Sequence, residues 1–275
     1  MKSDSSKFSS LSRRVPTAVA GAVIILGGTY LSMWSYFVIF LLITAFTQLE
    51  FYKLARLDDM LPLKYWGTLI GLSFFAFTFL VEADIIPMKY FLFVFPLLAS
   101  VFLVKLYKKD EKPFTHVAFT YLGIIYVAIP FSLLNVIVFS TGEYSHQIVI
   151  GTMLIIWASD TGAYFSGIIF GKKKLFERIS PKKTWEGSAG GGLVALAMAW
   201  GVSTFFHDLR LGQWFAAAAL IVITGTYGDL VESLFKRSIE IKDSGSSIPG
   251  HGGFLDRFDS LLLASPFIVV FIKIF

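Results

Sequence analysis

The sequence contains no cysteine and few charged residues. The absence of cysteine from all 275 residues excludes disulfide bonds, thiolate metal sites and cysteine nucleophiles. It also means that cysteine usage does not indicate whether the protein resides in a reducing or an oxidising compartment. Charged residues make up 16% of the chain, whereas a soluble domain carries about a quarter. Apolar runs of membrane-spanning length recur from residue 15 to the end. We therefore expect one integral membrane domain over residues 1–275 and no separate soluble domain.

The apolar runs predict nine membrane-spanning helices. A helix needs about 20 apolar residues to cross a bilayer. The uncharged run from Val15 to Leu49 has 35 residues, which is enough for two spans and too long for the apolar part of a signal peptide. Pro130 should kink the fifth helix, because proline lacks a backbone N–H donor. The fold class is therefore all-α and polytopic, with helices over about 15–31, 34–54, 65–82, 89–106, 115–139, 147–170, 188–206, 211–235 and 254–274.

The positions of lysine and arginine orient these helices. Cytoplasmic loops of membrane proteins carry an excess of basic residues. If the N-terminus is cytoplasmic and nine helices alternate, 21 of the 24 basic residues fall on the inside. The net charge of +5 is then explained by topology rather than by nucleic-acid binding. The two longest inside loops, about 171–187 and 236–253, are also the richest in glycine, lysine and acid. We therefore expect the functional surface to face the cytoplasm.

Five carboxylates lie within the predicted spans or at their ends, at Asp160, Asp229, Glu232, Asp256 and Asp259. Ionised groups at membrane depth are costly, so they are usually paired, solvated in a cavity or functional. Asp256 and Asp259 share a helix face, as do Asp229 and Glu232. If the last two helices pack antiparallel, Asp229 can meet Asp256 and Asp259, and clustered oxygen ligands suit Mg²⁺. The alternative is a set of salt bridges that only anchors the helix ends.

Two inside loops add donors for anions. The stretch "PGHGG" (249–253) predicts a glycine loop followed at once by a helix start, where free backbone N–H groups favour anions. A lone histidine in such a loop is more often a hydrogen-bond donor than a metal ligand. The stretch "SPKKTWEG" (180–187) mixes Ser, Thr, Trp and Glu with lysines. Its basic residues would also suit contact with anionic lipid headgroups, and both interpretations stay open.

Residues 233–259, "SLFKRSIEIKDSGSSIPGHGGFLDRFD", resemble the signature of the phosphatidate cytidylyltransferases, also called CDP-diacylglycerol synthases. The stretches "SDTGAY" (159–164) and "SPKKTWEG" (180–187) resemble a second block of that family. The resemblance places the catalytic signature over 229–260, with a contribution from the loop 171–187. The fixed positions of the signature are met at Ser233, Lys236, Arg237, Lys242, Asp243, Gly245, Pro249, His251, Gly252, Gly253, Asp256, Arg257 and Asp259.

The resemblance implies Mg²⁺-dependent transfer of the cytidylyl group of CTP to phosphatidate, giving CDP-diacylglycerol and pyrophosphate for phospholipid biosynthesis. It also implies a bacterial inner-type membrane and suggests a homodimer. On this basis we predict Asp229 and Asp256 as metal ligands, with a second cation left open, and Lys236, Asp243 and Asp259 as catalytic residues. The predicted substrate-binding residues are Asp160, Ser180, Lys182, Lys183, Thr184, Arg237, Lys242, His251, Gly252, Gly253 and Arg257.

Two other functions were weighed against this one. A related CTP-using membrane lipid enzyme, such as a polyprenol or phytol kinase or an archaeal lipid cytidylyltransferase, stays open because it would differ in its lipid pocket. An ion-coupled transporter is disfavoured, because it predicts charges near the bilayer midplane on several helices. Here every acid of the set except Asp160 lies near a predicted cytoplasmic helix end.

Overall fold

The computed structural model describes residues 3–56, 61–241 and 252–275, with side chains from residue 16 onward. Helices dominate the described chain, as the apolar runs predict. The elements in chain order are α1 (Ser3–Leu31), α2 (Met33–Ala55), α3 (Lys64–Glu82), the 3-10 helix η2 (Met88–Phe93), α4 (Val94–Leu106), α5 (Pro113–Gly123), the π-helix η3 (Ile124–Ala128), α6 (Ile129–Val138), α7 (Gln147–Phe170), β1 (Lys174–Phe176), β2 (Ser180–Thr184), α8 (Trp185–Phe205), α9 (Leu211–Ser238) and α10 (Leu255–Ile274).

Seven of the described helical segments are long and apolar enough to cross a membrane. They are Met33–Ala55, Lys64–Glu82, Met88–Leu106, Pro113–Val138, Gln147–Phe170, Trp185–Phe205 and Leu211–Ser238. The apolar part of α1, Pro16–Leu31, is shorter. Helix α10 is 20 residues long but carries Asp256, Arg257 and Asp259 in its first turns and Lys273 near its end. The all-α, polytopic architecture is thus confirmed, whereas the exact count of nine spans stays a prediction.

Three local features differ from the predicted elements. Helix α1 begins at Ser3, within the polar N-terminal segment, and continues through Pro16. The loop predicted at 171–187 contains a two-stranded antiparallel hairpin, in which Lys174 pairs with Thr184 and Phe176 with Ser180. The helix around Pro130 is interrupted by the π-helical turn Ile124–Ala128, which ends directly before α6.

Apolar packing and a few buried polar contacts join the helices. Large buried side chains such as Tyr36, Phe131 and Trp214 belong to one core cluster. Within it, the Tyr36 hydroxyl donates to Asn135 Oδ1 at 3.0 Å, and Asn135 Nδ2 donates to the Phe75 carbonyl at 3.0 Å. Such contacts satisfy polar groups between helices that lie in lipid.

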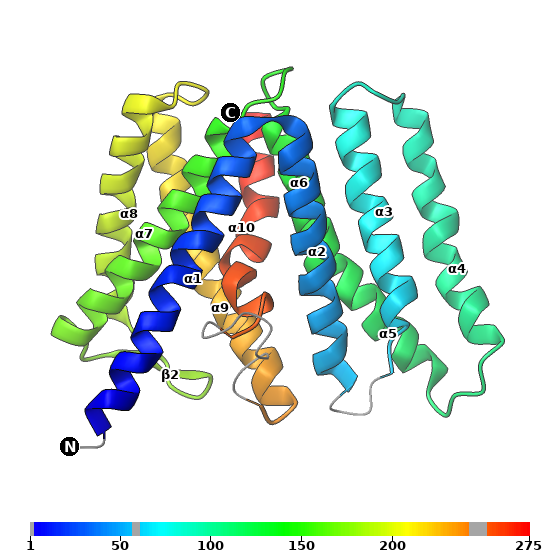
Figure 1. The fold of residues 1–275 in the computed structure, drawn as a ribbon, viewed down its shortest axis with the longest axis horizontal. Coiled ribbons are helices and arrows are strands. Elements are labelled where there is room, and N and C mark those ends of the chain that lie inside the picture. The colour runs from blue at the N-terminus through cyan, green and yellow to red at the C-terminus, as the bar shows by residue number, and fades with distance from the viewer. Residues whose placement is uncertain (1–2, 57–60, 242–251) are drawn as a thin grey trace.

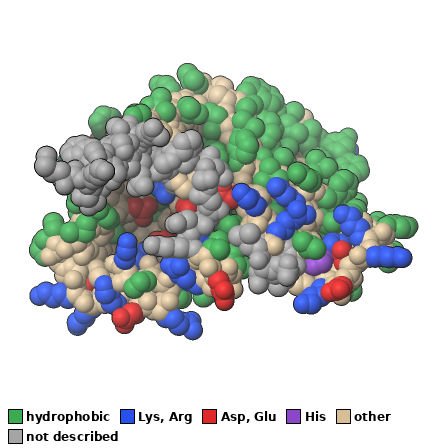
Figure 2. Space-filling view, turned by 60° about the horizontal axis from the view of Figure 1, so that its bottom comes forward, with side chains coloured by type: hydrophobic (Ala, Val, Ile, Leu, Met, Phe, Trp, Pro, Cys, Tyr) green, Lys and Arg blue, Asp and Glu red, His purple; other side chains and the backbone are tan. Residues whose placement is uncertain are grey.

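The ends of several elements meet at one side of the bundle. In Figure 1 the N-terminal end of α1, the hairpin, the end of α9 and the start of α10 all lie at the bottom. Figure 2 turns that side forward and shows many lysine and arginine side chains on it, with carboxylates among them. Hydrophobic side chains cover the adjoining flank.

Candidate functional site

The crossing of α9 and α10 forms the centre of the candidate site. Gly228 lies so close to α10 that a Cβ atom at this position would be 2.5 Å from the backbone oxygen of Asp259. Only glycine permits this approach, because any other residue would place a side chain against the neighbouring backbone. The crossing therefore brings the residue after Gly228, Asp229, next to the first turns of α10.

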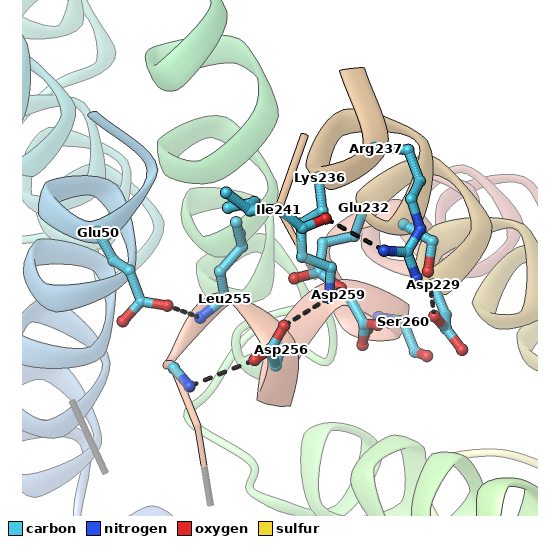
Figure 3. A network of polar contacts seen from close by, with 12 residues as sticks. Glu50, Asp229, Glu232, Lys236, Arg237, Ile241, Leu255, Asp256, Asp259 and Ser260 are labelled. Atoms are coloured by element: carbon cyan, nitrogen blue, oxygen red, sulfur yellow. Dashed lines mark hydrogen bonds and ion pairs between the residues drawn. The ribbon is translucent and has the colours of Figure 1, made fainter. Parts of the chain in front are cut away.

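Three carboxylates gather at this crossing. Single oxygen atoms of Asp229, Glu232 and Asp259 lie within 4.8 Å of one another. Asp229 and Glu232 are three residues apart on α9, so they share a helix face, and Asp259 faces them from α10 (Figure 3). Glu232 is buried and the two aspartates are half-buried. Oxygen atoms at this spacing can surround a hard divalent cation.

Two lysines neutralise part of this negative charge. Lys236 Nζ lies 2.9 Å from Glu232 Oε2 and 2.7 Å from Asp256 Oδ1. Lys183 Nζ lies 2.5 Å from Asp229 Oδ2. Counted as ionised, the carboxylates of Asp229, Glu232, Asp256 and Asp259 exceed the two lysines by two formal charges. One divalent cation would balance that charge.

The β-hairpin carries Lys183 to the cluster. Strand β2 ends at Thr184, whose hydroxyl caps α8 by accepting a hydrogen bond from the Gly187 N–H at 3.1 Å. The carboxylate of Glu186 accepts from the backbone N–H of Lys172 at 3.1 Å and of Lys173 at 3.1 Å. These bonds tie both ends of the hairpin to the start of α8. Lys183 can therefore reach α9, where it also donates to the Thr226 carbonyl at 3.4 Å.

The start of α10 is held by an acid from a distant helix. Glu50 on α2, which is 5% exposed, accepts hydrogen bonds from the backbone N–H of Phe254 at 3.0 Å and of Leu255 at 3.2 Å. The side chain of the N-cap residue Phe254 makes no capping hydrogen bond. The Glu50 carboxylate caps α10 instead (Figure 3). Glu50 was not among the residues predicted for the site. The sequence feature that could have indicated it is a single acid at the end of a long uncharged run.

The structure brings together several of the residues predicted for the site. Asp229 and Asp259 belong to the carboxylate group, and Asp256 pairs with Lys236 beside it. The Asp256 Oδ2 atom also accepts from the Gly253 N–H at 3.3 Å. Gly252 adopts a φ of +84°, which glycine tolerates. The assignments of metal ligand and catalytic residue within this group stay predictions.

The remaining predicted residues lie around this centre or outside the described chain. Asp160 on α7 is within electrostatic range of Lys183, Asp229 and Arg257. Ser180 and Lys182 lie on β2, where Lys182 is exposed. Arg237 is exposed and donates from Nη1 to the Ile241 carbonyl at 3.2 Å. Lys242, Asp243 and His251 lie outside the described residues.

Comparison with known proteins places the chain in a family. The Cytidylyltransferase family matches residues 12–275. A phosphatidate cytidylyltransferase of Bacillus subtilis is 34% identical over 277 residues, covering 96% of this chain and 98% of that protein. A phosphatidate cytidylyltransferase of Staphylococcus epidermidis is 40% identical over 62% of this chain and 65% of that protein. One of Haemophilus influenzae is 46% identical over 43% of this chain and 43% of that protein. With a family match over nearly its whole length, this chain belongs to the cytidylyltransferase family.

Proposed function

We propose that the protein transfers the cytidylyl group of CTP to phosphatidate, releasing pyrophosphate and forming CDP-diacylglycerol. The observation that carries the proposal is the group of Asp229, Glu232 and Asp259 between two lysines on apolar helices. Such a site suits phosphate-bearing substrates, one of which is held in the bilayer. The names of the three bacterial relatives support the same reaction.

The site fits a divalent cation, which we propose to be Mg²⁺. Its donors are carboxylate oxygens, the type that Mg²⁺ prefers, and the four carboxylates, counted as ionised, exceed the two lysines by two formal charges. Glu232 Oε1 is moreover buried without a hydrogen-bond partner among the described residues. Asp229, Glu232 and Asp259 would hold the ion, with Asp256 as a further candidate and a second cation left open. Bound there, Mg²⁺ supplies positive charge to the phosphate oxygens during displacement at phosphorus.

The chain's own residues position the substrates and balance their charge. A non-bridging oxygen of the lipid phosphate attacks the α-phosphorus of CTP, and the bond to pyrophosphate breaks. Because a phosphate monoester loses its second proton near pH 6, phosphatidate needs little help from a general base at neutral pH. Lys183 and Lys236 lie where their ammonium groups can bind phosphate oxygens. Positioning and charge neutralisation dominate in such reactions.

We also propose a topology for this reaction. Nine spans with a cytoplasmic N-terminus would add α1 and α10 to the seven long apolar helices. This arrangement would place 21 of 24 basic residues, and the carboxylate group, on the cytoplasmic side of a bacterial inner-type membrane. Water-borne CTP would then reach the site from the cytoplasm and phosphatidate from the bilayer. The homodimer stays a prediction from the family resemblance.

A direct assay tests the proposed reaction. Purified protein in detergent is mixed with CTP, phosphatidate and Mg²⁺, and both pyrophosphate release and lipid-extractable cytidine are measured. Equal amounts of the two products are expected, and neither should form when Mg²⁺ is replaced by a chelator. Pyrophosphate without lipid-bound cytidine would point to hydrolysis of CTP and would refute the proposal.

A further inference from the structure

Tyr126 lies on an irregular turn in the middle of a membrane-spanning segment. It belongs to the π-helical turn Ile124–Ala128, within the span Pro113–Val138. Pro130 has no N–H with which to bond the Tyr126 carbonyl four residues earlier, so the regular helix is interrupted here. The Ile129 N–H bonds to the Ile124 carbonyl instead, in the i−5 pattern of a π-helix. Single π-helical turns inside α-helices are frequent at functional sites.

The Tyr126 hydroxyl lacks a hydrogen-bond partner in the part of the chain that the structure describes. Its oxygen is buried and bonds to no atom of the described chain. Three other tyrosines of this core do have partners: the Tyr52 hydroxyl donates to the Thr120 carbonyl at 2.7 Å, that of Tyr121 to the Leu98 carbonyl at 2.9 Å, and that of Tyr36 to Asn135. Buried tyrosine hydroxyls usually find a partner. The Tyr126 hydroxyl is therefore an exception that needs a reason.

The same phenol lies near enough to the carboxylate group to feel its charge. It lies within electrostatic range of Asp259, Glu232 and Asp229, and its π-helical turn packs against α10. The side chain of a helical residue leans toward the N-terminus of its helix. Here that direction is toward the bottom of Figure 1, the side on which α5 and α10 begin.

The carboxylate group itself contains a second polar atom that has no partner among the described residues. Glu232 Oε2 receives Lys236 Nζ at 2.9 Å, whereas Glu232 Oε1 is buried without a partner in the described chain. One hydrogen-bond donor and one acceptor thus stay unused at the same group of acids. Leaving such groups buried and unpaired is costly, so both are suited to a ligand that enters the site.

We propose that the Tyr126 hydroxyl donates a hydrogen bond to an oxygen atom that is present only when the site is loaded. That oxygen belongs either to a substrate phosphate or to a water molecule bound to the cation. A neutral donor is useful here, because phosphate must enter among carboxylates and a further cation would need its own counter-charge within the membrane. The inference rests on the proposed function for its substrates and adds a binding residue that lies outside the family signature.

The test compares Tyr126→Phe with Tyr121→Phe. Each change removes one hydroxyl, and the two tyrosines lie on neighbouring turns of the same segment. The Tyr121 hydroxyl, however, donates a hydrogen bond to the Leu98 carbonyl. We expect Tyr126→Phe to lower kcat/KM about ten- to a hundredfold, the effect of losing one hydrogen bond to a charged oxygen. Its melting temperature should be unchanged or higher, since no hydrogen bond among the described residues is lost. Tyr121→Phe should show the reverse: a lower melting temperature and a normal kcat/KM.

A Mn²⁺ titration and the kinetic constants together identify the oxygen. If it belongs to cation-bound water, Tyr126→Phe weakens Mn²⁺ binding measured by electron paramagnetic resonance without substrate. If it belongs to a phosphate, Mn²⁺ binding stays normal and only the kinetic constants for CTP or phosphatidate change. Either result supports the inference.

Normal kinetics and normal Mn²⁺ binding in Tyr126→Phe would overturn the inference. So would a lower melting temperature with normal kinetics, because the hydroxyl would then serve the fold. If wild-type protein transfers no cytidylyl group, the proposed function fails separately. The substrate-phosphate alternative then fails with it, and only a bond to cation-bound water is left to test. Weakened Mn²⁺ binding in Tyr126→Phe would support that bond, and unchanged binding would overturn the inference.

Discussion

Replacing Gly228 with alanine should separate the two helices that form the site. The added Cβ would lie 2.5 Å from the backbone oxygen of Asp259 and 3.0 Å from the Cα of Ser260. A normal van der Waals contact is about 3.5 Å, so one helix must move by about 1 Å. The obstacle is backbone rather than the end of a flexible side chain, so a rotamer change cannot relieve it. Asp229 and Asp259, which flank the clash, would move apart.

The expected loss of activity follows from this displacement. Ligand distances at a metal site are held to about 0.2 Å, and a misplacement of about 1 Å can cost about a hundredfold in rate. We therefore expect kcat/KM to fall by about ten- to a hundredfold in the cytidylyl-transfer assay, with weaker Mn²⁺ binding. Overpacking should also lower the free energy of unfolding by about 1–3 kcal/mol, measured by thermal melting in detergent.

Gly225→Ala is the matched control. Gly225 lies one turn earlier on α9 and faces the same helix, but its Cβ would stay 3.4 Å from the nearest atom, Ser260 Cβ. Both changes give the same gain in helix propensity, so a difference between them reports the clash alone. Wild-type activity and Mn²⁺ binding in Gly228→Ala would show that the carboxylates do not depend on this crossing, and the reasoning would be refuted.

Four further substitutions test the helix cap, the cation site and an ion pair outside the site. Glu50→Gln should cost about 1–2 kcal/mol of stability and reduce kcat, because a charged cap of α10 is lost; unchanged melting and kcat would contradict this. Asp229→Asn and Asp259→Asn should each weaken Mn²⁺ binding by at least about tenfold, and unaltered titrations in both would contradict the proposed cation site. The Lys105 ammonium, which donates to Asp110 at 2.5 Å, holds the pKa of that carboxyl below its ordinary value. The pair should therefore stabilise the fold above about pH 4, the pKa range of an unfolded aspartate, and this contribution should vanish as the pH falls through the lowered pKa. Melting curves of Asp110→Asn should lack this step; an identical acid dependence would exclude the pair as its source.

The spans could be predicted from sequence because hydropathy acts locally. Helices α2, α3 and α7 begin and end within one or two residues of their predicted bounds. The hairpin was missed because its lysine-rich strands carry no alternation of apolar and polar residues. Its shape depends on Glu186, whose hydrogen bond reaches across the loop to Lys172, and on Thr184, which caps α8 locally. Pro130 indicated an irregularity in this helix, but the sequence did not predict that it would be a π-helical turn.

The site could be predicted only in part. Spacing along α9 and α10 correctly indicated that Asp229 and Asp259 would come together. It could not decide between Glu232 and Asp256 as the third carboxylate of the group, because that depends on how α9 and α10 cross in space. Glu50 and Tyr126 come from helices distant in sequence, so no local pattern connects them with the site.

The destination of each phosphate of CTP tests the central claim most directly. Purified protein is supplied with phosphatidate, Mg²⁺ and CTP labelled in parallel reactions at the α- or the γ-phosphate, and the lipid is extracted. The account predicts the α-label in the lipid and the γ-label in released pyrophosphate. The γ-label in the lipid would mean that the protein is a CTP-using kinase, and no label in the lipid would contradict the proposed transfer altogether.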